Sequence, residues 1–229
     1  MKPWKRQLWV IPPLENGEFV ARMEQVLDVY KRPYDALRPV VCLDESPRQL
    51  IRETRRSLPA KPGAVARYDY EYERCGVCNV FLAVEPLAGK RIVEITERRA
   101  KHDWALFIEQ IAGHYPRAEK ITLVMDNLST HGPGSLYETF PPPAAKALWD
   151  RFELVYTPKH GSWLNIAEIE INVLNRQCLD RRIDTLAEVR AETRAWQSRR
   201  DNAQSRVDWQ FTCDDARIKL KRLYPTLEM

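Results

Sequence analysis

The chain has 229 residues, with 36 Lys and Arg against 32 Asp and Glu, a formal net charge of +4 and 44% hydrophobic residues. This composition can fill a sizeable core and excludes a mainly disordered chain, while the mild positive charge permits contact with a polyanion without establishing it. No apolar run approaches the roughly 20 residues that cross a bilayer, and the first residues lack an apolar signal region, so we expect a cytoplasmic protein without membrane contact.

The first half of the sequence predicts a helix, three strands and a second helix. Apolar residues at helical spacing indicate the helices, and short apolar runs between turns indicate the strands. The Pro/Gly turn at 86–89 indicates that the last two strands form an antiparallel hairpin. In chain order, the predicted segments are a helix over 15–32, a strand over 40–43 that ends at Asp44, strands over 77–85 and 91–95, and a helix over 101–112.

The second half alternates strands and helices. The predicted segments are a strand over 121–125, a Gly/Pro-rich connection over 133–143, a short helix over 144–150, a strand over 152–156, a helix over 166–179 and a last helix that begins at the capping residue Thr185. This order predicts an α/β fold with a mixed sheet, in which an antiparallel hairpin joins parallel strands, flanked by helices. No glycine-rich phosphate-binding motif occurs, which argues against nucleotide-binding folds.

The five cysteines are an odd, scattered set, so we expect reduced thiols. Cys75 and Cys78 have the spacing of half a zinc site. No second pair of cysteines or histidines follows, and the next residues indicate a strand. We therefore interpret this pair as residues that enter a strand.

Two acidic residues follow apolar strands in the predicted sheet. Asp44 and Asp126 each end such a run, and ligands of open α/β sheets collect at the carboxyl ends of strands. If the two strands are neighbours, the carboxylates stand roughly 5 Å apart. Two anions that close repel each other unless a cation lies between them, and Mg²⁺ is the natural occupant.

A third acid is expected from the helix that starts near residue 166. Glu168 shares a polar stripe of this helix, whereas Glu170 falls among apolar residues, where a carboxylate must be paired or bind a metal. Both remain candidates. Glu45 follows Asp44 directly and points to the other face of its strand, so we leave it outside the site.

The order of these motifs resembles a known family. Leu43-Asp44-Glu45, the run from Met125 to His131, and Asn165-Ile166-Ala167-Glu168 together look like the signature of DDE transposases of bacterial insertion sequences related to mariner, insertion sequence family 630. The resemblance implies an RNase H-like fold and makes Asp44, Asp126 and Glu168 the metal ligands, with Glu170 as the alternative. It also implies two Mg²⁺ or Mn²⁺ ions and DNA strand cleavage followed by strand transfer.

Further expectations follow from the resemblance. Asn127 and His131 would orient phosphate or solvent, although a turn cap and an ordinary loop histidine explain them equally well. Phosphate contacts would come from the basic residues Arg48, Arg52, Lys159, His160, Arg181 and Arg182. The DNA partners would be transposon ends and a TA-containing target, bound by a homodimer at the bacterial nucleoid.

The resemblance also suggests a division of the chain. We expect a lead-in segment over residues 1–38, an RNase H-like catalytic domain over 39–200 and a C-terminal extension over 201–229. Such transposases find DNA ends with helix-turn-helix units, so a separately encoded N-terminal fragment is one expected partner. Two alternatives stay open: another RNase H-like nuclease or integrase, and an inactive truncated transposase that acts only as a DNA-binding or regulatory partner.

Overall fold

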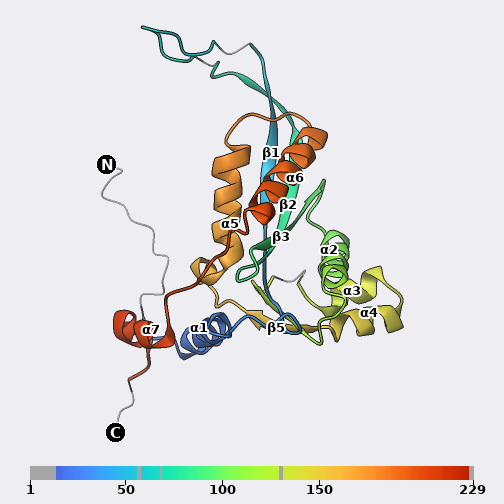
Figure 1. Ribbon diagram of the computed structural model, residues 1–229, viewed down its shortest axis with the longest axis vertical. Coiled ribbons are helices and arrows are strands. Elements are labelled where there is room, and N and C mark those ends of the chain that lie inside the picture. The colour runs from blue at the N-terminus through green and yellow to red at the C-terminus, as the bar shows by residue number, and fades with distance from the viewer. Residues whose placement is uncertain (1–13, 56–57, 68, 129–130, 227–229) are drawn as a thin grey trace.

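The computed structural model describes residues 14–55, 58–67, 69–128 and 131–226 (Figure 1). Five strands form one sheet in the order β3-β2-β1-β4-β5. The pairs β1/β2 and β2/β3 are antiparallel, and β1/β4 and β4/β5 are parallel, so the predicted mixed sheet is confirmed. The strands are β1 (Val40–Glu53), β2 (Tyr72–Glu85), β3 (Lys90–Thr96), β4 (Ile121–Met125) and β5 (Phe152–Tyr156).

Helices cover both faces of the sheet, and each face has its own apolar core. Helices α2, α3 and α4 pack on one face, and α1, α5 and α6 on the other (Figure 1). None of the described helices is both long and apolar enough to span a bilayer. The helices are α1 (Gly17–Tyr30), α2 (Lys101–His114), α3 (Pro133–Thr139), α4 (Pro142–Trp149), α5 (Ile166–Leu174), α6 (Leu186–Asn202) and α7 (Cys213–Lys219).

The centre of the sheet is covered on both faces. All five residues of β4 are buried. In β1, Cys42 belongs to the core beneath α5, whereas Val41 and Leu43 belong to the core beneath α2. Because successive side chains of a strand point to opposite faces, a strand buried on both sides must be apolar throughout. For this reason the apolar run predicted β4 at its observed bounds. The predicted bounds of β5 are also confirmed, although this edge strand is only partly buried.

Strand β1 is longer than predicted. Its parallel pairing with β4 ends at Cys42, but its antiparallel pairing with β2 continues to Glu53. Beyond Leu43 the strand is mostly exposed or half-buried, so polar residues and even Pro47 are tolerated there. The prediction that this strand ends at Asp44 was therefore wrong. Asp44 lies inside β1, where its neighbour β4 stops.

The helical segments also differ from the prediction at two places. Residues 133–143 hold α3 and the start of α4, because Pro133 and Pro142 occupy first turns, where a helix needs no backbone N–H. Helix α5 ends at Leu174 and continues as a π-helical turn, Asn175–Leu179. Such turns interrupt the regular hydrogen bonding of an α-helix.

The lead-in helix belongs to the core. Helix α1 begins after Asn16, whose side-chain oxygen accepts the Phe19 N–H at 3.0 Å. The residues that α1 buries against the sheet are Phe19, Met23, Val26, Leu27 and Val29. The division of the chain at residues 38 and 200 stays a prediction.

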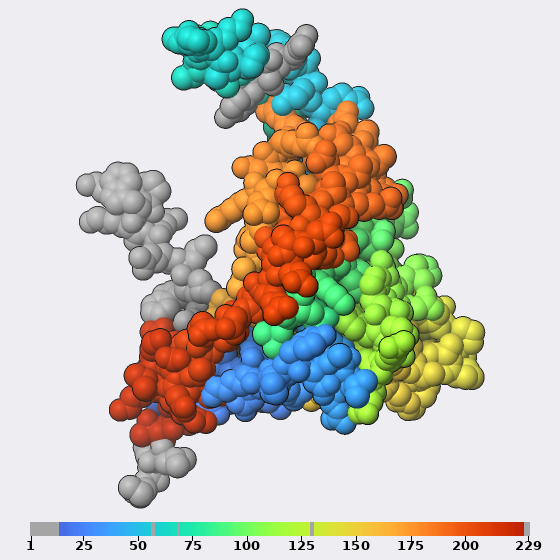
Figure 2. Space-filling model, in the orientation of Figure 1, coloured from blue at the N-terminus to red at the C-terminus, as the bar shows by residue number. Residues whose placement is uncertain are grey.

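Strands β1 and β2 extend together into an arm that projects from the body of the molecule (Figures 1 and 2). Their pairing reaches Glu53 and Tyr72. The register shifts near Cys75, beside Gly76 with φ +115°, a conformation that favours glycine. Cys75 and Cys78 lie within β2 as free thiols, in agreement with the strand interpretation.

A buried ionic network fastens α5 to the rest of the fold. Both Glu170 oxygens accept hydrogen bonds from Arg91 of β3, at 2.8 and 3.1 Å, and Arg200 of α6 donates a third at 2.8 Å. The side chains of Glu170 and Arg91 are 1% and 0% exposed. Arg91 also donates to the backbone oxygens of Gly89 and Ser205. The network joins three elements around one carboxylate.

We predict that Glu170→Gln lowers the free energy of unfolding by about 3 kcal/mol, because it removes the bidentate carboxylate partner of a fully buried arginine and leaves only Asp201, at 3.6 Å, to balance the charge of Arg91. Urea unfolding measures this loss. Glu168→Gln, two residues away on the same helix, is the matched control and should change stability by less than about 1 kcal/mol. Equal losses in the two variants would contradict the role assigned to the network.

Candidate active site

Strand pairing brings the first two predicted acids together. Cys42 of β1 pairs with Val124 of β4 in parallel register. Continued by two residues, this register places Asp44 beside Asp126, which directly follows β4. The sequence argument that these two residues meet at neighbouring strands is therefore supported by the topology.

Asn165 holds the start of α5 against the same place. Its side-chain oxygen accepts the Ala167 N–H at 3.1 Å and caps the helix, while its amide nitrogen donates to the Leu43 carbonyl oxygen at 2.9 Å. Leu43 precedes Asp44, so the cap ties the first turn of α5 to the strand that carries the acid. Glu168 lies in that first turn and is half-buried. An asparagine cap thus sets the approach of Glu168 to Asp44.

The pKa of Asp44 reflects how close these acids lie to one another. Burial, helped by the negative charges of Asp126, Glu45 and Glu168, raises the pKa of Asp44 to about 7, although a hydrogen bond from the Glu45 N–H acts to lower it. Neighbouring carboxylates disfavour each other's charged forms, as does removal from water. The acids therefore repel one another at neutral pH.

A buried histidine connects Asp126 with Glu45. His131 Nε2 lies 3.0 Å from Glu45 Oε2, and Nδ1 lies 2.6 Å from Asp126 Oδ1. Burial alone would lower the pKa of His131, but the hydrogen bonds and charges of Asp126 and Glu45 prevail and raise it to about 9. Both ring nitrogens face acceptors, which only the doubly protonated ring satisfies. Strand alternation placed Glu45 outside the site in the sequence prediction, and its link to Asp126 passes through His131, 86 positions away, which no local pattern reveals.

The predicted ligands have the chemistry that binds a divalent cation, but their side chains are not close enough together to enclose one. Within the described ranges, no three His, Cys, Asp or Glu side chains are grouped closely enough to hold a metal ion. The carboxylates of Asp44, Asp126 and Glu168 supply hard oxygen donors, and a cation would relieve the repulsion that raises the pKa of Asp44. Glu170, the alternative third acid, is occupied by Arg91 and Arg200.

A groove opens beside Asp126. It has a volume of about 550 Å³, and its lining includes Asp126, Asn127, Lys159 and His160. The turn that presents Lys159 and His160 is tight, because a Cβ on Gly161 would lie 2.5 Å from Pro158. Its lining also includes Asn16, which caps α1, and three residues of α1 itself, Glu18, Phe19 and Arg22. Two of the predicted phosphate-binding residues thus line the same groove as Asp126.

The four predicted arginines are engaged within the protein. Arg48 donates to the Leu179 and Arg181 carbonyl oxygens. The other three form ion pairs with carboxylates: Arg52 with Asp184 and Glu73, Arg181 with Glu188 and Glu192, and Arg182 with Glu53. The partners of these four arginines lie 21 to 133 residues away or on the following helix, so the sequence alone did not reveal them.

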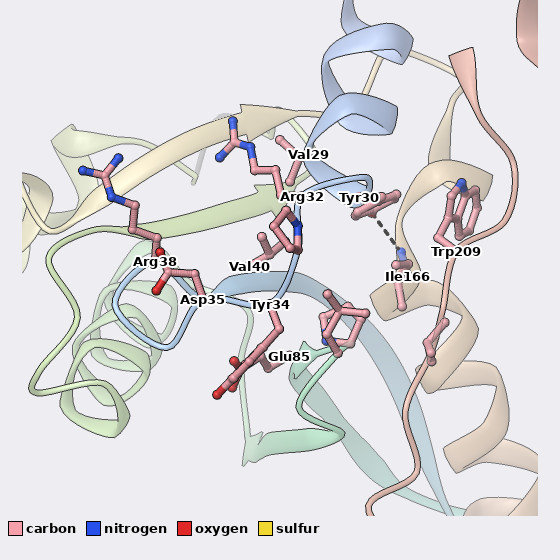
Figure 3. Close-up of a pocket in the computed structure, with 14 residues that line it drawn as sticks. Val29, Tyr30, Arg32, Tyr34, Asp35, Arg38, Val40, Glu85, Ile166 and Trp209 are labelled. Carbon is pink, nitrogen blue, oxygen red and sulfur yellow. Dashed lines mark hydrogen bonds between the residues drawn. The ribbon is translucent and has the colours of Figure 1, made fainter. Parts of the chain in front are cut away.

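A further pocket contains none of the predicted site residues. Figure 3 shows it between the end of α1, the start of β1 and the β2/β3 turn, with Tyr30, Arg32 and Trp209 among its lining. The Tyr30 hydroxyl accepts the Ile166 N–H at 3.4 Å and donates to the Leu164 carbonyl oxygen at 2.7 Å. These bonds support the segment that leads into α5.

Comparison with known families agrees with this geometry. The model of the DDE superfamily endonucleases matches residues 39–190. This range covers most of the chain, including Asp44, Asp126 and Glu168, and the chain therefore belongs to that family. A search of curated proteins gives no match.

Solved structures share the fold. The chain is similar to a Mos1 mariner paired-end complex with Mn, at TM-score 0.57 and 15% identity over 89% of this chain and 62% of that one. It is also similar to the Mos1 strand transfer complex, at TM-score 0.59 and 15% identity over 89% and 61%, and to a mariner Mos1 paired-end complex with Mg, at TM-score 0.58 and 14% identity over 98% and 68%. The chain thus spans less than two thirds of the first two relatives. The fold is RNase H-like, as the resemblance implied.

We predict that Asp44→Asn stabilises the metal-free protein at pH 8. A carboxyl whose folded pKa of about 7 exceeds its unfolded value destabilises the fold as pH rises from about 4 to 7. The variant lacks this penalty and should gain about 2–4 kcal/mol at pH 8 but little at pH 4. Urea unfolding in EDTA at both pH values measures the difference. An equal effect at the two values would contradict the raised pKa.

Proposed function

We propose that this protein is the catalytic part of a transposase that cleaves DNA and transfers the freed strand, with Asp44, Asp126 and Glu168 as the catalytic acids. The observation that carries the proposal is the electrostatic coupling of Asp44 to Asp126 and Glu168. These acids come from three separate segments of a chain that belongs to the DDE superfamily endonucleases. Glu168 is preferred over Glu170, because Glu170 already serves two arginines.

The acids would hold two Mg²⁺ or Mn²⁺ ions. When bound, such an ion pair activates water or a 3′-hydroxyl and stabilises the leaving oxygen of a phosphodiester. Asp44 lies on β1 and Glu168 on the capped first turn of α5, so rigid elements orient both carboxylates. Asp126 lines the groove. The scissile phosphate would therefore approach from the groove side.

The groove is the proposed path of the DNA strand. Lys159 and His160 line it beside Asp126, and no described carboxylate forms an ion pair with Lys159, so its charge is available to a phosphate. Asn127 is exposed at the same wall. Arg48, Arg52, Arg181 and Arg182 would have to exchange internal partners for phosphates, and we assign them a smaller contribution.

The finer identity is also part of the proposal. We infer an insertion sequence transposase of family 630 type that acts in the bacterial nucleoid as a homodimer on transposon ends and joins them to a TA-containing target. A separately encoded helix-turn-helix fragment would supply end recognition. The motif order around Asp44, Asp126 and Asn165 supports this inference, together with the likeness to structures that are described as paired-end and strand transfer complexes.

We predict that Asp44→Asn, Asp126→Asn and Glu168→Gln each reduce DNA cleavage at least 100-fold, because each removes a metal ligand. The assay is nicking of supercoiled plasmid with Mn²⁺, together with joining of an oligonucleotide 3′-hydroxyl to plasmid. Glu85→Gln, a buried acid of β2 outside the site, should retain activity. Cleavage that survives in Asp44→Asn would overturn the assignment, and cleavage without joining would favour a plain nuclease.

We predict that Lys159→Ala weakens DNA binding and lowers the slope of log affinity against log salt by about 1, because one phosphate contact is lost. Fluorescence anisotropy with a labelled duplex between 50 and 200 mM salt tests this. Lys146→Ala is the matched control, because Lys146 lies on α4 and pairs with Asp150. The same slope in wild type and Lys159→Ala would exclude the groove as the DNA path.

A further inference from the structure

Glu45 is a buried acid that the proposed reaction does not use. Its side chain is 2% exposed, next to Asp44 on β1. Besides His131, the cation nearest to it among the described residues is Arg99, with Nε 3.7 Å from Glu45 Oε1. A carboxylate buried in this way costs several kcal/mol unless it is paired. Its place beside the proposed site therefore calls for an explanation.

The His131 ring is held on three sides. Trp104 of α2 stacks on it, with ring centres 5.6 Å apart and planes inclined by 19°. Glu45 fixes the Nε2 edge at 3.0 Å. On the opposite edge, Nδ1 lies 3.2 Å from the Asp126 backbone oxygen and 2.6 Å from Asp126 Oδ1. The ring is 1% exposed, so it cannot turn without losing these contacts.

The contact divides the two oxygens of Asp126. Asp126 Oδ1 is buried, although the Asp126 side chain as a whole is 40% exposed. The exposure therefore falls on the remaining atoms, Oδ2 among them. One oxygen thus lies against His131, while the exposed part of the side chain lines the groove. Polar groups that contact a metal-binding carboxylate commonly orient it, and loss of such an outer partner costs roughly 10–100-fold in metal affinity.

We propose that Glu45 is a positioning residue that fixes the Asp126 carboxylate for a divalent cation by acting through His131. The inference rests on the proposed function, because it takes Asp126 as a metal ligand. The chain of contacts runs from β1, through the space beneath α2, to the loop after β4. Glu45 thus reaches the site from the face of the sheet opposite to Asp44.

The test is Mn²⁺ binding to the DNA-free full chain, measured by isothermal titration calorimetry. Glu45→Gln keeps the size of the side chain and removes its charge, and we expect Mn²⁺ to bind 10–100-fold more weakly. Glu85→Gln, a buried acid of the neighbouring strand that pairs with Tyr115, is the matched control and should bind Mn²⁺ as wild type does. If Glu45→Gln fails to fold, Glu45→Asp replaces it, with a smaller loss expected.

A double-mutant cycle separates positioning from mere structural support. If Glu45 acts through His131, adding Glu45→Gln to His131→Ala should cost no further Mn²⁺ affinity. Wild-type affinity in Glu45→Gln, or additive losses in the double variant, would overturn the inference. Failure of the proposed function has a different signature: wild type would bind no Mn²⁺, or Asp126→Ala would bind it as wild type does.

Discussion

Repulsion between carboxylates around Asp44 is the constraint on which the rest of this site depends. Burial and three neighbouring acids all disfavour the charge of Asp44. The surrounding fold holds the acids in place. Strand β1 pairs with β4, and the Asn165 side chain ties α5 to the Leu43 carbonyl oxygen. The protein holds the acids together in spite of their charges, which is the state that a divalent cation would stabilise.

Helix α5 carries both the proposed catalytic acid, Glu168, and a structural acid, Glu170. Glu168 faces the charges around Asp44, whereas Glu170 is buried between Arg91 and Arg200. A charge placed among apolar residues was correctly expected to need a partner, but the sequence could not say whether that partner was a metal or an arginine. The answer required β3 and α6, which lie 79 and 30 residues away from Glu170.

Local signals predicted the parts of the fold that local physics determines. The continuous apolar run predicted β4 because both of its faces are covered, and Thr185 marked the start of α6. The second half of β1 was missed because an exposed ribbon needs no apolar pattern. The contacts within the site were missed because they join residues far apart in the chain. Glu45 meets His131 across 86 residues, and Arg52 meets Asp184 across 132.

Diffraction from a crystal soaked in Mn²⁺ tests the central claim most directly. Anomalous scattering locates the ions without any assumption about activity. The account predicts two peaks between the carboxylates of Asp44, Asp126 and Glu168, roughly 3.5 to 4 Å apart, with Glu170 still paired to Arg91. Absence of peaks at these acids in a crystal that binds Mn²⁺ elsewhere, or a peak at Glu170, would contradict it.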